Sequence, residues 1–177
     1  MIIKSISHSQ KQSARTLINY VFDGRKSLED EKGNRLLFKQ LVKSYQKEKW
    51  IQQFEELEAN RQSHYGTKSV VCYHEVVSFS DKSTQHLNRS ILKDLVERYI
   101  KLRTDQNMLC VGAVHFEKNR NWHAHLVFSG LRTTDYKSAR ISKKRMAEIK
   151  VLLQQYQINT YPLLEDSVVR HGLKKKN

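Results

Sequence analysis

Three of the eight histidines in this chain, His115, His123 and His125, lie within a stretch of eleven residues. Neutral imidazole nitrogens are common ligands of divalent metal ions, and three of them leave coordination positions open for water or substrate oxygens. If 123–128 is a strand, His123 and His125 point to the same side of it, because side chains alternate between the two faces of a strand. The apolar run before them ends at His115, and a hairpin loop over 117–122 sets His115 opposite the pair. The spacing predicts an open, catalytic kind of metal site.

Two other interpretations of this stretch stay open. Strand histidines also occur as packed or hydrogen-bonded residues that bind no metal. Glu117, two residues beyond His115, could orient one imidazole as a hydrogen-bond acceptor or act as a base, or it could be a solvated loop carboxylate.

A metal centre of this kind needs a nucleophile, for which water, serine or tyrosine are the candidates. Tyr20 lies in the segment SARTLINYVFDGRK at 13–26, in which apolar residues recur at helical spacing and Arg15, Arg25 and Lys26 flank the tyrosine. From composition alone, a tyrosine in such a segment is more often a half-buried core residue.

The 177 residues carry 32 Lys and Arg against 18 Asp and Glu, a formal net charge of +14. Such a field attracts polyanions, and nucleic acid is a better fit than a membrane surface because the basic helices also carry acidic residues. Cys72 and Cys110 sit in apolar runs without metal-ligand spacing, which indicates buried thiols in a reducing compartment. With no apolar run of about 18 residues and no signal-peptide pattern, we expect a cytoplasmic protein that does not insert into membranes.

Hydrophobic periodicity predicts an α+β fold with a central, mostly antiparallel sheet. A histidine-bearing hairpin lies at its centre, and helices pack on one face and around it. We expect one domain over 1–177, with a helical insertion at about 34–62 and a basic tail at 172–177. Strands are predicted at 1–7, 68–80, 109–116, 123–128 and 168–170. Helices are predicted at 13–22 with Ser13 as N-cap, at 33–60 as one helix or a pair, from a cap at Ser83 or Thr84 to 102, and at 138–156.

In content and order, four segments resemble the three motifs of conjugative relaxases, most closely the MobP, VirD-like branch of the HUH endonucleases. They are INYV at 18–21 followed by RK at 25–26, the strand YHEVVSFS at 73–80, HFE at 115–117, and HAH at 123–125. The sequence departs from that branch at Glu117, where Asp is frequent, and after His125, where LVFSG replaces a segment ending in Asn.

The resemblance implies a site- and strand-specific endonuclease that nicks DNA at an origin of transfer and can rejoin it. Tyr20 would be the nucleophile that forms a 5′-phosphotyrosine, and His115, His123 and His125 would hold a divalent ion. Mg²⁺ or Mn²⁺ is the expected ion, with Zn²⁺ as an alternative. The implied partners are single-stranded or hairpin DNA, auxiliary relaxosome proteins and a coupling protein. A tyrosine before the histidines is the order found in relaxases rather than in replication initiators.

The remaining site residues are predicted as DNA contacts or as supports of the metal site. Arg15, Arg25 and Lys26 are expected near the nucleophile; Lys68, Arg140, Lys143, Lys144 and Arg145 are expected along the DNA. His74 and Glu75 are candidates for a second shell or a base, but neighbouring strand residues face opposite ways, so at most one faces the site.

Two alternative functions remain at this point. One keeps the superfamily and makes the protein a replication or transposition nickase. The other is a non-catalytic basic nucleic-acid-binding module whose histidines are structural.

Overall fold

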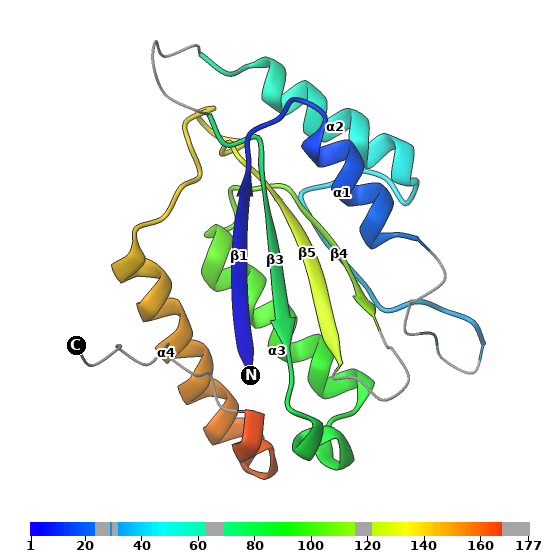
Figure 1. The fold of residues 1–177 in the computed structure, drawn as a ribbon, viewed down its shortest axis with the longest axis vertical. Coiled ribbons are helices and arrows are strands. Elements are labelled where there is room, and N and C mark those ends of the chain that lie inside the picture. Colours follow the sequence, from blue (N-terminus) through cyan, green and yellow to red (C-terminus); the bar gives the residue numbers. More distant parts are fainter. Residues whose placement is uncertain (24–28, 30–31, 63–68, 116–121, 168–177) are drawn as a thin grey trace.

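The computed structural model describes residues 1–177 except 24–28, 30–31, 63–68, 116–121 and 168–177 (Figure 1). Within the described residues, five strands form one sheet in the order β1-β3-β5-β4-β2, and every neighbouring pair is antiparallel. The strands are β1 (Ile2–His8), β2 (Leu37–Gln40), β3 (Cys72–Ser78), β4 (Cys110–His115) and β5 (His123–Ser129). The predicted α+β class and the central histidine-bearing hairpin are thereby confirmed.

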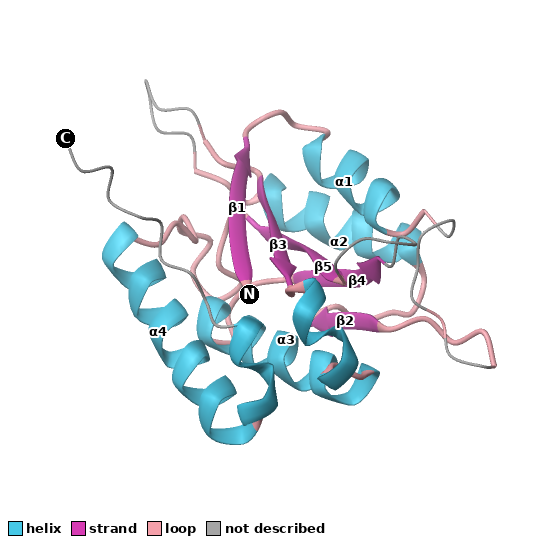
Figure 2. Ribbon diagram, turned by 60° about the horizontal axis from the view of Figure 1, so that its bottom comes forward, coloured by secondary structure: helices cyan, strands magenta, loops and turns pink. Residues whose placement is uncertain are grey.

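Helices cover both faces of the sheet rather than chiefly one (Figure 2). The helices are α1 (Ser13–Val21), α2 (Lys47–Ala59), α3 (Arg89–Thr104) and α4 (Lys143–Thr160), with 3-10 turns η2 (Asp81–His86) and η3 (Pro162–Ser167). Helices α1 and α2 pack on the face that carries Val111 and Val127, whereas α3 and α4 pack on the face that carries Leu126 and Phe128. Strand β5 is buried on both faces, but only the α3 side is fully apolar, with Ala124, Leu126 and Phe128, whereas the other side carries His123 and His125 beside Val127.

The segment predicted as helical over 33–60 is helical only in its second half. Its first half contains the edge strand β2, which pairs with β4. Leu37 packs against the α1 and α2 side, and Phe38 is buried on the α3 side. A short apolar run that is buried on alternating faces has no helical signature, so periodicity alone misassigns it.

Three helix starts also differ from the prediction. Ser13 is the first residue of α1, whose N-cap Gln12 makes no side-chain capping bond. The cap of α3 is Asn88, which accepts a hydrogen bond from the Ile91 amide, because residues 81–86 form a 3-10 turn first. Helix α4 starts at Lys143 and not near 138. The strand predicted at 168–170 and the basic tail at 172–177 lie outside the described residues.

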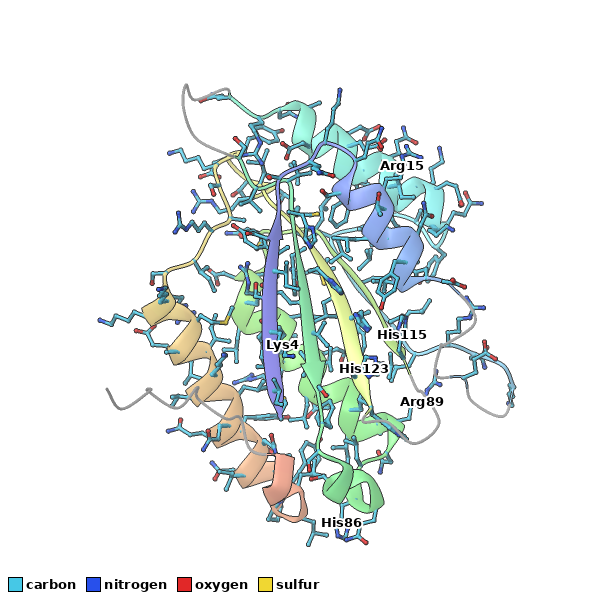
Figure 3. The ribbon with its side chains drawn as sticks, viewed as in Figure 1. Lys4, Arg15, His86, Arg89, His115 and His123 are labelled. Carbon is cyan, nitrogen blue, oxygen red and sulfur yellow. The ribbon has the colours of Figure 1, made fainter. Side chains whose placement is uncertain are left out.

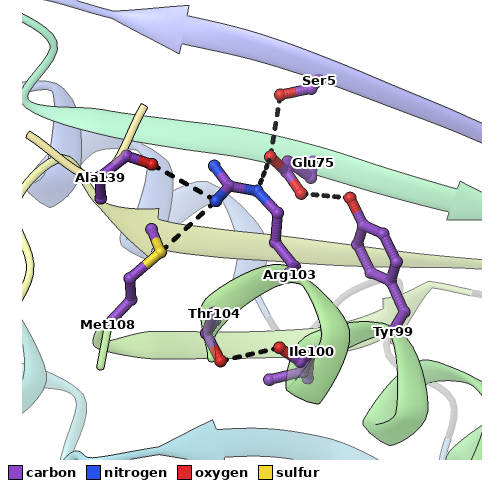
Figure 4. A network of polar contacts seen from close by, with 8 residues as sticks. All are labelled: Ser5, Glu75, Tyr99, Ile100, Arg103, Thr104, Met108 and Ala139. Carbon is purple, nitrogen blue, oxygen red and sulfur yellow. Dashed lines mark hydrogen bonds and ion pairs between the residues drawn. The ribbon is translucent and has the colours of Figure 1, made fainter. Parts of the chain in front are cut away.

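A buried polar network lies on the α3 side of the sheet (Figure 4). Glu75 is fully buried and forms an ion pair of 2.9 Å with Arg103 Nε. Its carboxylate also accepts hydrogen bonds from the hydroxyls of Ser5 and Tyr99. Burial and the Glu75 charge raise the pKa of Tyr99 well above its ordinary value, so the phenol stays a donor. The network ties β1 and β3 to α3, and every charge in it is matched.

The two cysteines are free thiols, and both are buried. Burial, with a smaller effect of Glu58, raises the pKa of Cys72 to about 12, and burial raises the pKa of Cys110 well above its ordinary value. None of the described helices is both long enough and apolar enough to cross a membrane.

We expect Glu75→Gln to lower the free energy of unfolding by about 3 kcal/mol, because it leaves the Arg103 guanidinium buried without its counter-charge. Urea unfolding measures this change. The control is Glu148→Gln, which removes an exposed ion pair with Arg145 and should change stability by less than about 0.5 kcal/mol. Equal stability of the two variants would contradict the assigned role of the network.

We expect neither thiol to react with a thiol-specific disulfide reagent at pH 8 in the folded protein, because the raised pKa values keep both protonated and burial blocks access. In denaturant both thiols should react. A rapidly modified thiol in the native protein would show that Cys72 or Cys110 is accessible.

Candidate metal centre and nucleophile

The strand register brings the three predicted histidines together. His115 lies directly opposite His123 in the β4–β5 pair, and His125 follows on the same face. One ring nitrogen from each histidine lies within 4.8 Å of the others. His115 and His125 are 2% and 7% exposed, whereas His123 is partly open to solvent. Figure 3 shows His115 and His123 side by side on the sheet face below α1. Three imidazoles with one open side fit a divalent ion.

Outer hydrogen bonds orient two of these rings. Nε2 of His115 is 2.8 Å from the carbonyl oxygen of Val21. A carbonyl only accepts, so Nε2 carries the proton and Nδ1 is the nitrogen with the free electron pair. Nδ1 of His125 is 2.8 Å from Nε2 of His74, which leaves Nε2 of His125 for a metal. Such contacts fix the tautomer and direction of metal-binding histidines.

His74 and Glu75 fall on opposite faces, as strand alternation requires. His74 joins the histidine cluster, and burial lowers its pKa, with the neighbouring His8 and His115 adding to the effect. Glu75 belongs to the buried network behind the sheet, so its position excludes it from the site.

His8 is a cluster member that the sequence prediction missed. It pairs with Cys72 across β1 and β3, on the histidine face, and its ring centroid lies 6.4 Å from that of His74. Its Nε2 is buried without a hydrogen-bond partner among the described residues. Strand alternation over 1–8 places His8 on a face, but only the β1–β3 register shows which face that is.

Tyr20 stands over the cluster from α1. Its ring centroid lies 5.6 Å from that of His125, 6.0 Å from His115 and 6.2 Å from His74. Ile18 and Val21, from the same helix, are fully buried against the sheet, whereas Tyr20 is 49% exposed. The helix is therefore anchored on one side and presents a solvent-accessible phenol next to the imidazoles.

The predicted basic contacts divide into three groups. Arg15 is exposed on α1 and forms an ion pair of 2.8 Å with Glu55 of α2. Arg25, Lys26 and Lys68 lie outside the described residues, as does Glu117. The third group gathers just before α4 and in its first turn, where α4 packs on the sheet face opposite the histidines. It consists of Arg140, Lys143, Lys144 and Arg145.

One basic residue on the histidine face escaped the prediction. Lys4 is exposed on the edge strand β1, between the exposed Ile2 and Ile6, and lies opposite Val76 in the register that continues to His125 (Figure 3). This part of the face is not covered by α1 or α2 (Figure 1).

The fold is shared with solved relaxase structures. The MobM relaxase domain bound to pMV158 oriT DNA with manganese matches with a TM-score of 0.57 at 12% identity, over 100% of this chain and 94% of that one. The conjugative relaxase TrwC in complex with oriT DNA matches with a TM-score of 0.57 at 12% identity, over 92% of this chain and 70% of that one. A structure described as the molecular basis of vancomycin resistance transfer in Staphylococcus aureus matches with a TM-score of 0.58 at 12% identity, over 97% of this chain and 98% of that one. No protein with a curated description matches the sequence.

The sequence itself matches a family. The model of the MobA/VirD2-like relaxase nuclease domain covers residues 20–159, which include Tyr20, His115, His123 and His125. The chain therefore belongs to the MobA/VirD2-like relaxase family. The predicted class, a DNA-nicking enzyme of the conjugative relaxases, is confirmed.

We expect His123→Ala to weaken Mn²⁺ binding by more than about a hundredfold, because even lost outer-shell contacts cost up to that factor. Isothermal titration calorimetry of the metal-free chain measures it. His86→Ala is the control, since His86 is exposed on η2, far from the cluster (Figure 3). Unchanged affinity in His123→Ala would mean that the cluster is not the metal site.

Proposed function

We propose that this relaxase nicks one DNA strand at an origin of transfer by metal-assisted transesterification, with Tyr20 as the nucleophile. The Tyr20 oxygen attacks the phosphorus, the bond to the 3′ oxygen breaks, and the products are a 5′-phosphotyrosine and a free 3′-hydroxyl. The covalent link conserves the bond energy, so the reverse reaction rejoins the strand. The observation that carries this proposal is the position of the exposed Tyr20 ring. Its centroid lies about 6 Å from the ring centroids of His74, His115 and His125.

His115, His123 and His125 would hold the ion, and Mg²⁺ or Mn²⁺ is the proposed identity. When bound, such an ion would offset negative charge on the non-bridging phosphate oxygens. The residues of the chain orient the imidazoles and position the nucleophile. The Val21 carbonyl and His74 orient two imidazoles, and α1 positions the phenol above them.

The proton of the Tyr20 hydroxyl has to leave, because an ordinary phenol is scarcely ionised at neutral pH. Glu117 and His74 are the proposed acceptors. Arg15, Arg25 and Lys26 are proposed to bind phosphates near the nucleophile, and Lys68 further along the DNA.

The substrate is proposed to be single-stranded DNA or a hairpin arm, since the scissile phosphate must lie between a helix tyrosine and the sheet. The relaxases MobM and TrwC of similar fold are bound to oriT DNA, which supports this substrate class. The enzyme is proposed to act in the cytoplasm, with auxiliary relaxosome proteins and a coupling protein as partners.

The test mixes the chain, Mn²⁺ and a labelled single strand from the neighbouring transfer origin, and looks for a protein–DNA adduct that survives denaturant. We expect Tyr20→Phe to form no adduct and chelation of the metal to abolish it. Tyr136→Phe is the matched control, because Tyr136 is 45% exposed and Tyr20 49%. An adduct formed by Tyr20→Phe would show that another residue is the nucleophile.

Two further arms separate the alternatives. Oligonucleotides from a replication origin or a transposon end should not be cut; cleavage of these alone would assign the enzyme to replication or transposition. His123→Ala should lose cleavage but keep salt-sensitive DNA binding, with a slope of log affinity against log salt of about −4 for roughly six phosphate contacts.

A further inference from the structure

A cavity lies on the α3 side of the sheet, on the face opposite the histidines. Its volume is about 550 Å³, and it is bounded by β1, β3 and the start of α4. Among the described residues, its lining contains hydroxyl and cationic groups but no carboxylate. The lining residues are Ser5, Ser7, Val70, Tyr73, Arg103, Arg140, Ile141, Ser142, Lys143 and Met146.

The charge of this cavity is positive and only partly matched. Arg103 lines the cavity and forms an ion pair with Glu75, which is not among the lining residues. Arg140 and Lys143 form no ion pair with any residue that the structure describes. Both are exposed, so a ligand reaching the cavity meets two available positive charges.

The start of α4 adds to this preference for an anion. The first turn of a helix carries partial positive charge and amide groups without intrahelical acceptors. Acidic residues usually occupy such a turn, yet α4 has none there and instead carries Lys143, Lys144 and Arg145. Ser142 caps the Arg145 amide, which leaves the amides of 143 and 144 without an acceptor in the helix. A bound anion would reduce the repulsion among these three cations and accept hydrogen bonds from the two amides.

An independent observation comes from Tyr73. Its side chain is 7% exposed and lines the cavity, and its hydroxyl is buried with no hydrogen-bond partner among the described residues. Buried hydroxyls are almost always paired, because an unpaired one has lost its water without replacement. A phosphate oxygen in the cavity would be the missing acceptor.

We propose that this cavity binds a phosphate group, supplied by the backbone of the DNA strand as it leaves the histidine face. The edge strand β1 separates the two sites: Lys4 and Ile6 face the histidine side, and Ser5 and Ser7 face the cavity side. A DNA strand that crosses β1 would contact both the histidine face and the cavity. The choice of DNA as the phosphate source rests on the proposed function, whereas the phosphate site itself does not.

The experiment measures two affinities of the full chain in metal-free buffer, which prevents cleavage. Calorimetry gives the affinity for inorganic phosphate, and fluorescence anisotropy gives that for a labelled single strand. We expect Arg140→Ala to weaken phosphate binding about tenfold, the usual effect of losing a charge-assisted hydrogen bond. Tyr73→Phe, which keeps the ring, should weaken it severalfold. The control is Lys150→Ala, which removes one charge from α4 outside the cavity.

The outcomes separate the sources. If DNA affinity falls with phosphate affinity and the salt slope decreases by about 0.7 in Arg140→Ala, the DNA backbone occupies the cavity. If only phosphate affinity falls, the site takes a free phosphate or nucleotide. If both variants match Lys150→Ala in both assays, no phosphate site exists here. Tyr20→Phe should bind phosphate normally, so failure of the nicking proposal and failure of this one are distinguishable.

Discussion

The antiparallel register of β4 and β5 sets His115 opposite His123 with His125 on the same face, and the histidine cluster depends on this register. A slip by one residue would turn His123 and His125 to the other face. A slip would place these imidazoles among the apolar side chains of the α3 side, where Ala124, Leu126 and Phe128 are now fully buried, and unpaired polar groups there are costly. Gly112 adds a close approach: a Cβ there would lie 2.5 Å from Leu126 Cδ2 and 2.6 Å from the His125 carbonyl oxygen. Only glycine lets the two strands meet in this register.

The strand β3 serves both faces of the sheet with adjacent residues. His74 contacts the metal-binding candidate His125, whereas Glu75 anchors the network that includes Arg103 behind the sheet. The buried ion pair ties α3 to the strand that carries His74. Chemistry on one face is therefore supported by a matched charge pair on the other, through a single backbone segment.

Helix α1 has a buried side that packs on the sheet and an exposed side that carries Tyr20, and the site uses both. Val21 is fully buried, and its carbonyl oxygen accepts a hydrogen bond from His115, one residue after the exposed Tyr20. The same helical turn therefore orients an imidazole and presents a phenol. The uncovered part of that face carries Lys4, whereas the basic start of α4 lies on the other face. Basic side chains therefore lie on both sides of the sheet.

The sequence by itself determined the chemistry-bearing residues and their pairing, because strand alternation and a short hairpin loop are local constraints. It also gave the strands around His74, His115 and His123 and the family resemblance. Only the tertiary structure decided that Tyr20 meets the histidines, that His8 joins them and that Arg140 and Lys143 lie behind the sheet. Those placements depend on strand order and helix docking, which arise from contacts between residues distant in sequence. The edge strand β2 was missed for the same reason: Leu37 and Phe38 become a strand by pairing with β4.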